Sequence, residues 1–304
     1  MTVRRQWSQT MAREIEIKLS FSPDRMAGLE AALLALPGAR QGDRLAMRNT
    51  YYDTPDGQLN QHMMALRLRD AGGRPIQTLK TRGALSGGVA SRGEWEWPLS
   101  SYQLDYRLLA ETPLADSPLL PLLGPSFDTH FQRHIVDILP RGDDGPVVEA
   151  ALDHGEVLAG GQSKPLCELE LELKAGDPER LQRLAYQVSQ SVPLFLNTIS
   201  KAEQGYHLAG LYHPRIGDSS SDDPVDAWLH GLSVHWLEDS QAGWPAVLAL
   251  HGELRDKAMQ AGQEQAWQSV LTALEQHSQD ATPPREALQS MEQLAPLQLS
   301  LALG

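Results

Sequence analysis

The sequence contains one cysteine and no run of about 18 apolar residues, the length that a membrane-spanning helix needs. A single thiol cannot form an internal disulfide, so a reducing, cytoplasmic setting fits this composition. That cysteine, Cys167, has no Cys or His partner nearby in the sequence, and we interpret it as a packing residue rather than a nucleophile. The basic N-terminus lacks the apolar segment of a secretory signal, so residues 1–10 are predicted to be an N-terminal extension.

Positive charge is also scarce. Lys and Arg total 26 against 39 Asp and Glu, which gives a formal net charge of −13. A general nucleic-acid binder draws its affinity from a basic surface, so this function class is excluded, and no membrane association is expected. A small anionic substrate can still be bound, because local clusters of basic side chains matter more than the net charge.

The chain changes character along its length. Residues 11–212 alternate apolar and charged residues in short runs, which is typical of β-strands. Residues 213–224 are rich in Gly, Pro, Ser and Asp, and we predict a linker there. Residues 225–304 have helical spacing of Leu, Ala and Trp, so a small all-α C-terminal region is expected.

Eight strands are predicted in the first part. They are Arg13–Ser20, Met47–Tyr52, Ala65–Asp70, Ile76–Thr81, Ser91–Pro98, Phe131–Leu139, Val147–Asp153 and Cys167–Lys174. Helix-start signals intervene at Ser22-Pro23, Asp177-Pro178 and Ser200–Glu203. The pattern predicts an α+β fold, in which an eight-stranded antiparallel closed β-barrel is flanked by helices.

Two of these strands place acidic side chains on one face. Glu14, Glu16 and Lys18 alternate with apolar residues, and so do the three carboxylates of Glu168, Glu170 and Glu172. Carboxylates in a row repel one another unless a cation lies among them, and carboxylate oxygens are ligands that Mg²⁺ and Mn²⁺ prefer. For any single strand, a solvent-facing charged surface is the alternative.

Other strands carry the opposite charge. Arg67 and Arg69 share a strand face, and Lys80, Arg92 and Arg133 each lie on a further strand. Arginine binds phosphate oxygens in a bidentate fork. A barrel with acids on some strands and bases on others would complement a metal-bound polyphosphate, with the charged faces inside and the apolar faces outside.

Ordered motifs support this interpretation. The sequence Glu14-Ile-Glu-Ile-Lys18 resembles the ExExK signature of the CYTH superfamily, the triphosphate tunnel metalloenzymes. Further elements resemble the family in the same order: Arg48 before Tyr51-Tyr52-Asp53-Thr54-Pro55, Leu66-Arg67-Leu68-Arg69, Thr78-Leu79-Lys80, Arg92-Gly-Glu94-Trp-Glu96, Arg133, Asp153, Glu170-Leu-Glu172 and Ser200-Lys201.

The resemblance implies a charged tunnel that holds Mg²⁺ or Mn²⁺ and a triphosphate. The implied metal ligands are Glu14, Glu16, Glu170 and Glu172, with Glu168 on the same face and Asp153 as an additional acid. The implied phosphate-binding residues are Lys18, Arg48, Arg67, Arg69, Lys80, Arg133 and Lys201. Arg92 either joins them or pairs only with Glu94. The implied catalytic residues are Glu14, Glu16, Lys18, Glu170 and Glu172.

The implied reaction is metal-dependent hydrolysis of inorganic tripolyphosphate to diphosphate and phosphate, because the layout resembles that of bacterial inorganic triphosphatases. A class IV-type adenylate cyclase, a thiamine-triphosphatase and a non-catalytic polyphosphate-binding module are the alternatives. The helical region follows the order of a CHAD domain but is shorter and not basic, so it is either a reduced or an unrelated appendage. It could pack on the barrel or mediate a homodimer. Its residues His230, His235 and His251 are expected to be surface or partly buried residues rather than metal ligands.

Overall fold

The computed structural model describes residues 12–81, 83–139, 145–219 and 221–303. The predicted extension at residues 1–10 lies outside these described residues. The strands are β1 (Ala12–Ser20), β2 (Ala39–Asp53), β3 (Met64–Ala71), β4 (Pro75–Thr81), β5 (Ala84–Ser86), β6 (Val89–Pro98), β7 (Gly124–Ile138), β8 (Val147–Ala159), β9 (Gln162–Ala175) and β10 (Phe195–Leu196).

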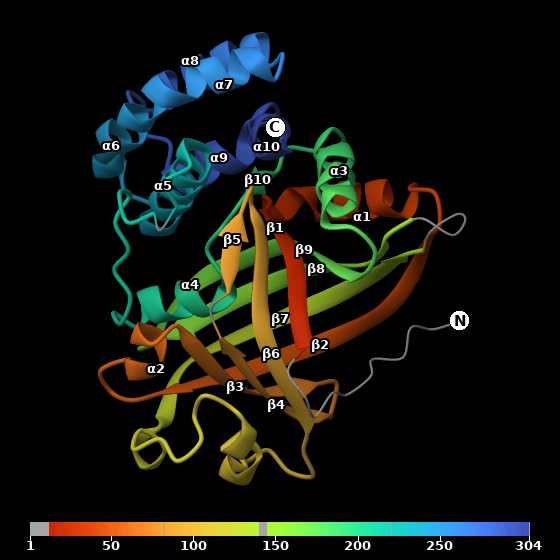
Figure 1. Ribbon diagram of the computed structural model, residues 1–304, viewed down its shortest axis with the longest axis vertical. Helices are drawn as coiled ribbons and strands as arrows, with labels where there is room; N and C mark the ends of the chain where they lie inside the picture. Colours follow the sequence, from red (N-terminus) through yellow and green to blue (C-terminus); the bar gives the residue numbers. More distant parts are fainter. Residues whose placement is uncertain (1–11, 82, 140–144, 220, 304) are drawn as a thin grey trace.

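Helices follow the N-terminal strands and fill the C-terminal part of the chain (Figure 1). They are α1 (Met26–Leu34), α2 (Gln58–Gln61), α3 (Pro178–Ser189), α4 (Lys201–Leu208), α5 (Pro224–Glu238), α6 (Trp244–Ala249), α7 (Leu254–Gln260), α8 (Glu264–His277), α9 (Pro284–Ser290) and α10 (Leu294–Leu303). Short 3₁₀ helices are η1 (Pro23–Arg25), η2 (Tyr106–Glu111), η3 (Leu120–Leu122), η4 (Gln241–Gly243) and η5 (Leu250–Glu253).

The predicted barrel is confirmed. Its strands follow the order β1-β9-β8-β7-β2-β3-β4-β6, and antiparallel pairing of β1 with β6 closes the ring. The short strands β10 and β5 pair alongside β1 and β6 respectively. Closure removes the exposed edges of the sheet, and it also creates an interior that the inward faces of eight strands share.

Four strands, β2, β7, β8 and β9, are at least six residues longer than the sequence predicted, and the other four differ by one or two residues. β2 begins at Ala39, because a register shift between Gln41 and Arg44 interrupts the regular alternation that the prediction relied on. β8 and β9 continue to a two-residue turn, Gly160-Gly161, in which both residues have positive φ, as such hairpins require. β7 likewise starts seven residues before the predicted Phe131, at Gly124.

The apolar faces of the strands point outward and are covered. Ile17 and Leu171 belong to the largest hydrophobic cluster, which also contains residues of α1, α3 and the C-terminal helices. On the opposite side, Trp95 and Trp97 pack with residues of the segment that carries η2 and η3. Solvent is thus kept from the outer apolar faces of the barrel, and the charged faces are left to the interior.

The C-terminal helices pack directly against the barrel, as Figure 1 shows for α10 beside β10 and α3. Gln298 of α10 is fully buried, and its side chain accepts from the Leu196 backbone N–H at 2.9 Å and donates to the Leu196 carbonyl at 3.1 Å. The boundaries at residues 213–224 and 225–304 stay predictions. The structure adds that barrel and helices share one hydrophobic cluster.

The expectation for two histidines is wrong. His235 and His251 are buried rather than exposed or partly buried, and they lie against Trp244 and Trp267 respectively. Burial lowers the pKa of both imidazoles to about 4, so both are neutral at pH 7. The sequence did not predict this burial, because histidine occurs both on protein surfaces and in protein interiors. Among the described residues, no helix has the length and apolar character needed to cross a membrane.

Gln298 supplies a test of this docking. We expect Gln298→Ala to lower the free energy of unfolding by about 2 kcal/mol, because the Leu196 N–H and C=O would be left buried without those partners. Urea denaturation followed by far-UV circular dichroism measures the change. Gln293→Ala, on the exposed side of the same region, is the matched control. A Gln298→Ala protein as stable as the control would contradict the structural role of this contact.

Candidate active site in the barrel interior

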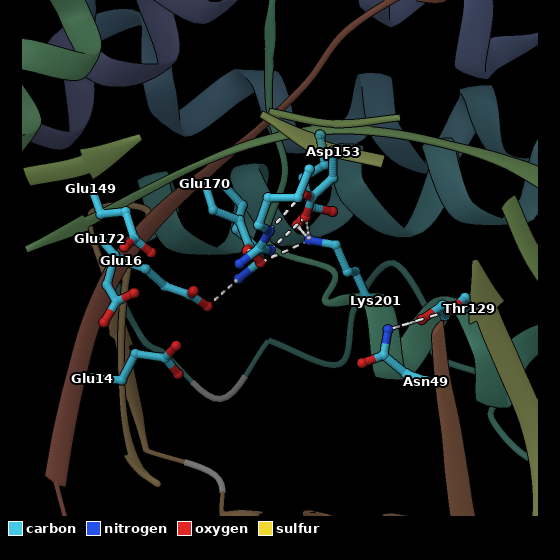
Figure 2. A network of polar contacts seen from close by, with 12 residues as sticks. Glu14, Glu16, Asn49, Thr129, Glu149, Asp153, Glu170, Glu172 and Lys201 are labelled. Carbon is cyan, nitrogen blue, oxygen red and sulfur yellow. Dashed lines mark hydrogen bonds and ion pairs between the residues drawn. The ribbon is translucent and has the colours of Figure 1, made fainter. Parts of the chain in front are cut away.

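Carboxylates lie in rows across three neighbouring strands. Glu16 of β1 is directly opposite Glu172 of β9, which is opposite Glu149 of β8. Four residues further along these strands, Glu168 of β9 is opposite Asp153 of β8. Because paired positions on adjacent antiparallel strands have Cβ atoms about 5 Å apart, these acids crowd one another. Figure 2 shows Glu14, Glu16, Glu149 and Glu172 on one side of the interior.

Two cations hold a second acidic group together. Lys201 Nζ lies 2.7 Å from Glu168, 2.9 Å from Glu170 and 2.9 Å from Asp153. Arg133 donates two hydrogen bonds to Asp153, at 2.7 and 2.6 Å, and a third to Glu170 at 2.7 Å. Figure 2 shows Asp153, Glu170 and Lys201 pointing toward one another. The bidentate fork fixes the Arg133 guanidinium in one orientation.

Local structure explains how Lys201 reaches this position. Ser200 caps α4 in a capping box with Glu203, so the helix starts where the sequence predicted. Gly205 lets α4 approach the barrel closely, because a Cβ at this position would lie 2.0 Å from the Phe127 ring. With α4 seated here, Lys201 as its first residue is 6% exposed and faces the barrel interior.

The ion pairs on the other side of the interior involve β1, β4 and β6. Glu14 accepts hydrogen bonds from Lys80 at 2.7 Å and from Arg92 at 2.9 Å. Arg92 also pairs with Glu16. Lys80 lies 3.2 Å from Glu94. Arg92 and Glu94 therefore have separate partners, and the idea that they pair only with each other is wrong.

The pKa values show which carboxylates are well compensated. For Glu14 and Glu170, burial opposes ionisation, but cations such as Lys80 and Lys201 overcome it and hold both pKa values well below the usual range. Burial raises the pKa of Glu168 to about 7 although Lys201 opposes it. Burial, together with the charges of Glu14 and Glu149, raises the pKa of Glu172 to about 7 against the effect of Lys174.

A cavity of about 810 Å³ lies between these groups. Its lining includes ten of the predicted site residues, namely Glu14, Lys18, Arg67, Arg69, Lys80, Arg92, Arg133, Glu170, Glu172 and Lys201, together with Glu149, which the sequence interpretation did not select.

 Glu149 is the one residue of this set that the sequence interpretation missed. Extending the alternation of β8 back from Asp153 would have found it, since Glu149 and Asp153 lie four residues apart on one strand face. The cavity thus brings most of the predicted acids and bases to one space.

Four predicted residues do not line this cavity. Arg48 is exposed and lies on the face of β2 opposite that of Asn49, so the structure does not bring it to the interior. Asn49 takes the inward position and accepts a hydrogen bond from Arg69 Nε at 2.7 Å. Asp153 and Glu168 lie behind Lys201, and Glu16 lies behind Arg92. Glu16, Asp153 and Glu168 are each at most 2% exposed.

The donor set suits a hard divalent cation. Glu14, Glu16, Glu149 and Glu172 offer only carboxylate oxygens, and burial together with the neighbouring charges of Glu14 and Glu149 raises the pKa of Glu172. Among the residues that the structure describes, no three acids, histidines or cysteines already surround a point that an ion could occupy. The carboxylates are turned toward side-chain cations instead.

Comparison with known proteins identifies a relative of this chain. An inorganic triphosphatase from Haemophilus influenzae is 32% identical over 201 residues, which make up 65% of this chain and 55% of that protein. The chain therefore spans little more than half the length of this relative.

Solved structures with the same kind of fold are more distant. A proposed adenylyl cyclase from Hippeastrum with a dominant triphosphatase activity is 24% identical, with a TM-score of 0.43, over 66% of this chain and 98% of that one. A proposed adenylate cyclase from Bacillus halodurans is 23% identical, with a TM-score of 0.44, over 64% of this chain and 98% of that one. These likenesses are too remote to inform the chemistry.

The sequence also matches the CYTH domain over residues 12–206, nearly two thirds of the chain and all eight strands of the barrel. The matched region carries the acidic strands, the basic strands and Lys201, so it contains every carboxylate, lysine and arginine named above around the charged cavity. By this match and by its closed, charge-lined barrel, the chain belongs to the CYTH family.

Proposed function

We propose that this protein hydrolyses inorganic tripolyphosphate to diphosphate and phosphate with Mg²⁺ or Mn²⁺. The observation that carries the proposal is the 810 Å³ cavity, which is lined by both carboxylates and basic side chains. Basic side chains for phosphate oxygens and carboxylates for a metal are what phosphoryl transfer requires, because its main demand is neutralisation of charge on oxygen. The named activity of the Haemophilus influenzae relative supports the choice of substrate.

In this proposal the bases bind and orient the substrate. Arg67, Arg69 and Lys80 lie on neighbouring strands β3 and β4, and Arg133 and Lys201 face them from β7 and α4. Each is now paired with a carboxylate or an amide oxygen, so a bound triphosphate would take over hydrogen bonds that the protein makes to itself. The cations are thereby held in place before the substrate arrives, which reduces the cost of ordering them.

Carboxylates divide into two roles. Glu14, Glu149, Glu170 and Glu172 line the cavity and would hold the metal together with Glu16, which pairs with Arg92. The metal would supply charge neutralisation at the phosphate oxygens and would lower the pKa of a bound water. We infer a different role for Asp153 and Glu168, which lie behind the cations and hold Lys201 and Arg133 in position.

The first test is phosphate release from tripolyphosphate and from ATP, each with Mg²⁺, with Mn²⁺ and with EDTA. We expect rapid release from tripolyphosphate with either metal, little from ATP, and none with EDTA. Absence of release from both substrates would overturn the proposed reaction. Formation of cyclic AMP or of thiamine diphosphate from the corresponding triphosphates would then identify one of the alternative activities.

Glu172 tests the metal-binding assignment. Glu172→Gln keeps the shape of the side chain and removes its charge, so we expect kcat to fall by about 100-fold or more, with the fold retained by circular dichroism. Glu156→Gln is the matched control, because Glu156 lies on the outer face of β8, where its carboxylate accepts a hydrogen bond from Ser163. Full metal-dependent activity in Glu172→Gln would remove this residue from the metal ligands.

The two arginines Arg69 and Arg48 test the substrate-binding assignment. Arg69 lines the cavity, and we expect Arg69→Ala to raise KM for tripolyphosphate by about tenfold, since a charge-assisted hydrogen bond contributes roughly 1.5 kcal/mol. Arg48 is exposed on the other face of the sheet, so Arg48→Ala is expected to leave KM unchanged. Steady-state kinetics would contradict this placement if Arg48→Ala had the larger effect.

A further inference from the structure

A second cavity, of about 310 Å³, adjoins the charged one beside the β5–β6 hairpin. Gly83, Ala84, Leu85 and His230 line both cavities, so these residues form the junction between them. His230 comes from α5, which lies after the region that matches the CYTH domain. Part of the wall around the charged cavity is therefore supplied by the C-terminal helices.

The hairpin is fixed to these helices by its tip. Gly87 N–H donates to Asp226 Oδ1 of α5 at 2.8 Å, and the Gly87 carbonyl accepts from Gln182 Nε2 of α3 at 3.2 Å. A Cβ on Gly87 would lie 2.8 Å from the Ala302 carbonyl, and its φ of +54° also favours glycine. In Figure 1 β5 reaches from the barrel toward α5 and α10.

Helix geometry places His230 on the same wall. Asp226 and His230 are four residues apart on α5, so they share one face of the helix. Asp226 anchors the hairpin while His230 faces the junction of the two cavities. The passage between the cavities thus has one side formed by the hairpin and the other by α5, and the contact through Asp226 holds the two sides together.

The second cavity is unsuited to phosphate. Beyond the shared residues it is lined by Asp218, Ser219, Ser221 and Asp226, and none of the described residues around it is Lys or Arg. Two carboxylates there would repel a further phosphate group, whereas a neutral organic group would meet no such repulsion. The room beyond the charged cavity is therefore available to the organic part of a substrate such as ATP, provided that it can pass His230.

We propose that His230 is a specificity-determining residue, and this rests on the proposed function. Its side chain narrows the junction between the two cavities, so that a compact triphosphate fits within the charged cavity while a triphosphate with a bulky organic group is held back. Selection for compact triphosphates then depends on a residue of the C-terminal region, although the acids and bases that bind the triphosphate belong to the CYTH domain.

The test compares kcat/KM for ATP with kcat/KM for tripolyphosphate in the full chain with Mg²⁺. His230→Ala is expected to raise the ratio of ATP to tripolyphosphate by about tenfold, because it opens the junction. His230→Trp is expected to lower the ratio, because it fills the junction further. A ratio taken within one preparation is insensitive to a loss of folded protein. His277→Ala, on α8 and away from both cavities, is the control and should leave the ratio unchanged.

Two results would overturn the inference: an unchanged ratio in both His230 variants, or a shift of the same sign in both. If the unaltered protein hydrolyses neither compound, the proposed function fails, and the inference is then tested by binding alone. Calorimetric dissociation constants for ATP and for tripolyphosphate give the same ratio without turnover. His230→Ala should favour ATP about tenfold relative to the unaltered protein, and an unchanged binding ratio would reject a role for His230.

Discussion

Pairing of buried opposite charges is the constraint on which the rest of this structure depends. Moving a carboxylate or a guanidinium out of water costs several kcal/mol of solvation free energy, and only well-placed partners of opposite charge offset this cost. Arg133 and Lys201 share three acids between them, and Arg92 and Lys80 share Glu14. Removal of one partner from such a pair costs about 3–5 kcal/mol, so the interior side chains are constrained as a set rather than singly.

This constraint explains why the barrel must be both closed and covered. If β1 and β6 were apart, water would reach the ion pairs of Glu14 with Lys80 and Arg92, and the cations would lose their fixed directions. The outer faces, in turn, need the hydrophobic cover that α1, α3 and the C-terminal helices provide. The usual arrangement of a small barrel, with an apolar interior, is reversed, and the function proposed for the cavity accounts for this reversal.

Much of the fold could be predicted from the sequence, because successive side chains of a β-strand point to opposite faces of the sheet. Glu14, Glu16 and Lys18 had to share a face, and the capping box at Ser200 had to start a helix. Arg48 was misplaced because a motif gives order along the chain but not the strand face, and Asn49 one residue later points inward. Glu149 was missed because the residue two positions on is Ala151, so the strand shows no charged run.

Contacts between distant segments could not be predicted. Asp226 binds the tip of a hairpin 139 residues earlier in the chain, and nothing in either segment shows that they meet. The burial of His251 likewise depends on Trp228 and Trp267, which reach it from two separate helices. The neighbours of a residue such as His230 are set by how the helices dock on the barrel, which local spacing does not encode.

The position of β1 in the sheet has a consequence for the order of folding. β1 is the first of the strands that the structure describes, yet its partners are β6, β9 and β10, the last of which ends at Leu196. During synthesis β1 cannot complete its pairing until the chain has been made as far as Leu196, so the ring closes late and through contacts of high sequence separation. Until then its charged face discourages association with the strands of other chains, as charged residues beside apolar segments generally do. The side chains that serve the cavity in the finished protein thus also protect the chain while it folds.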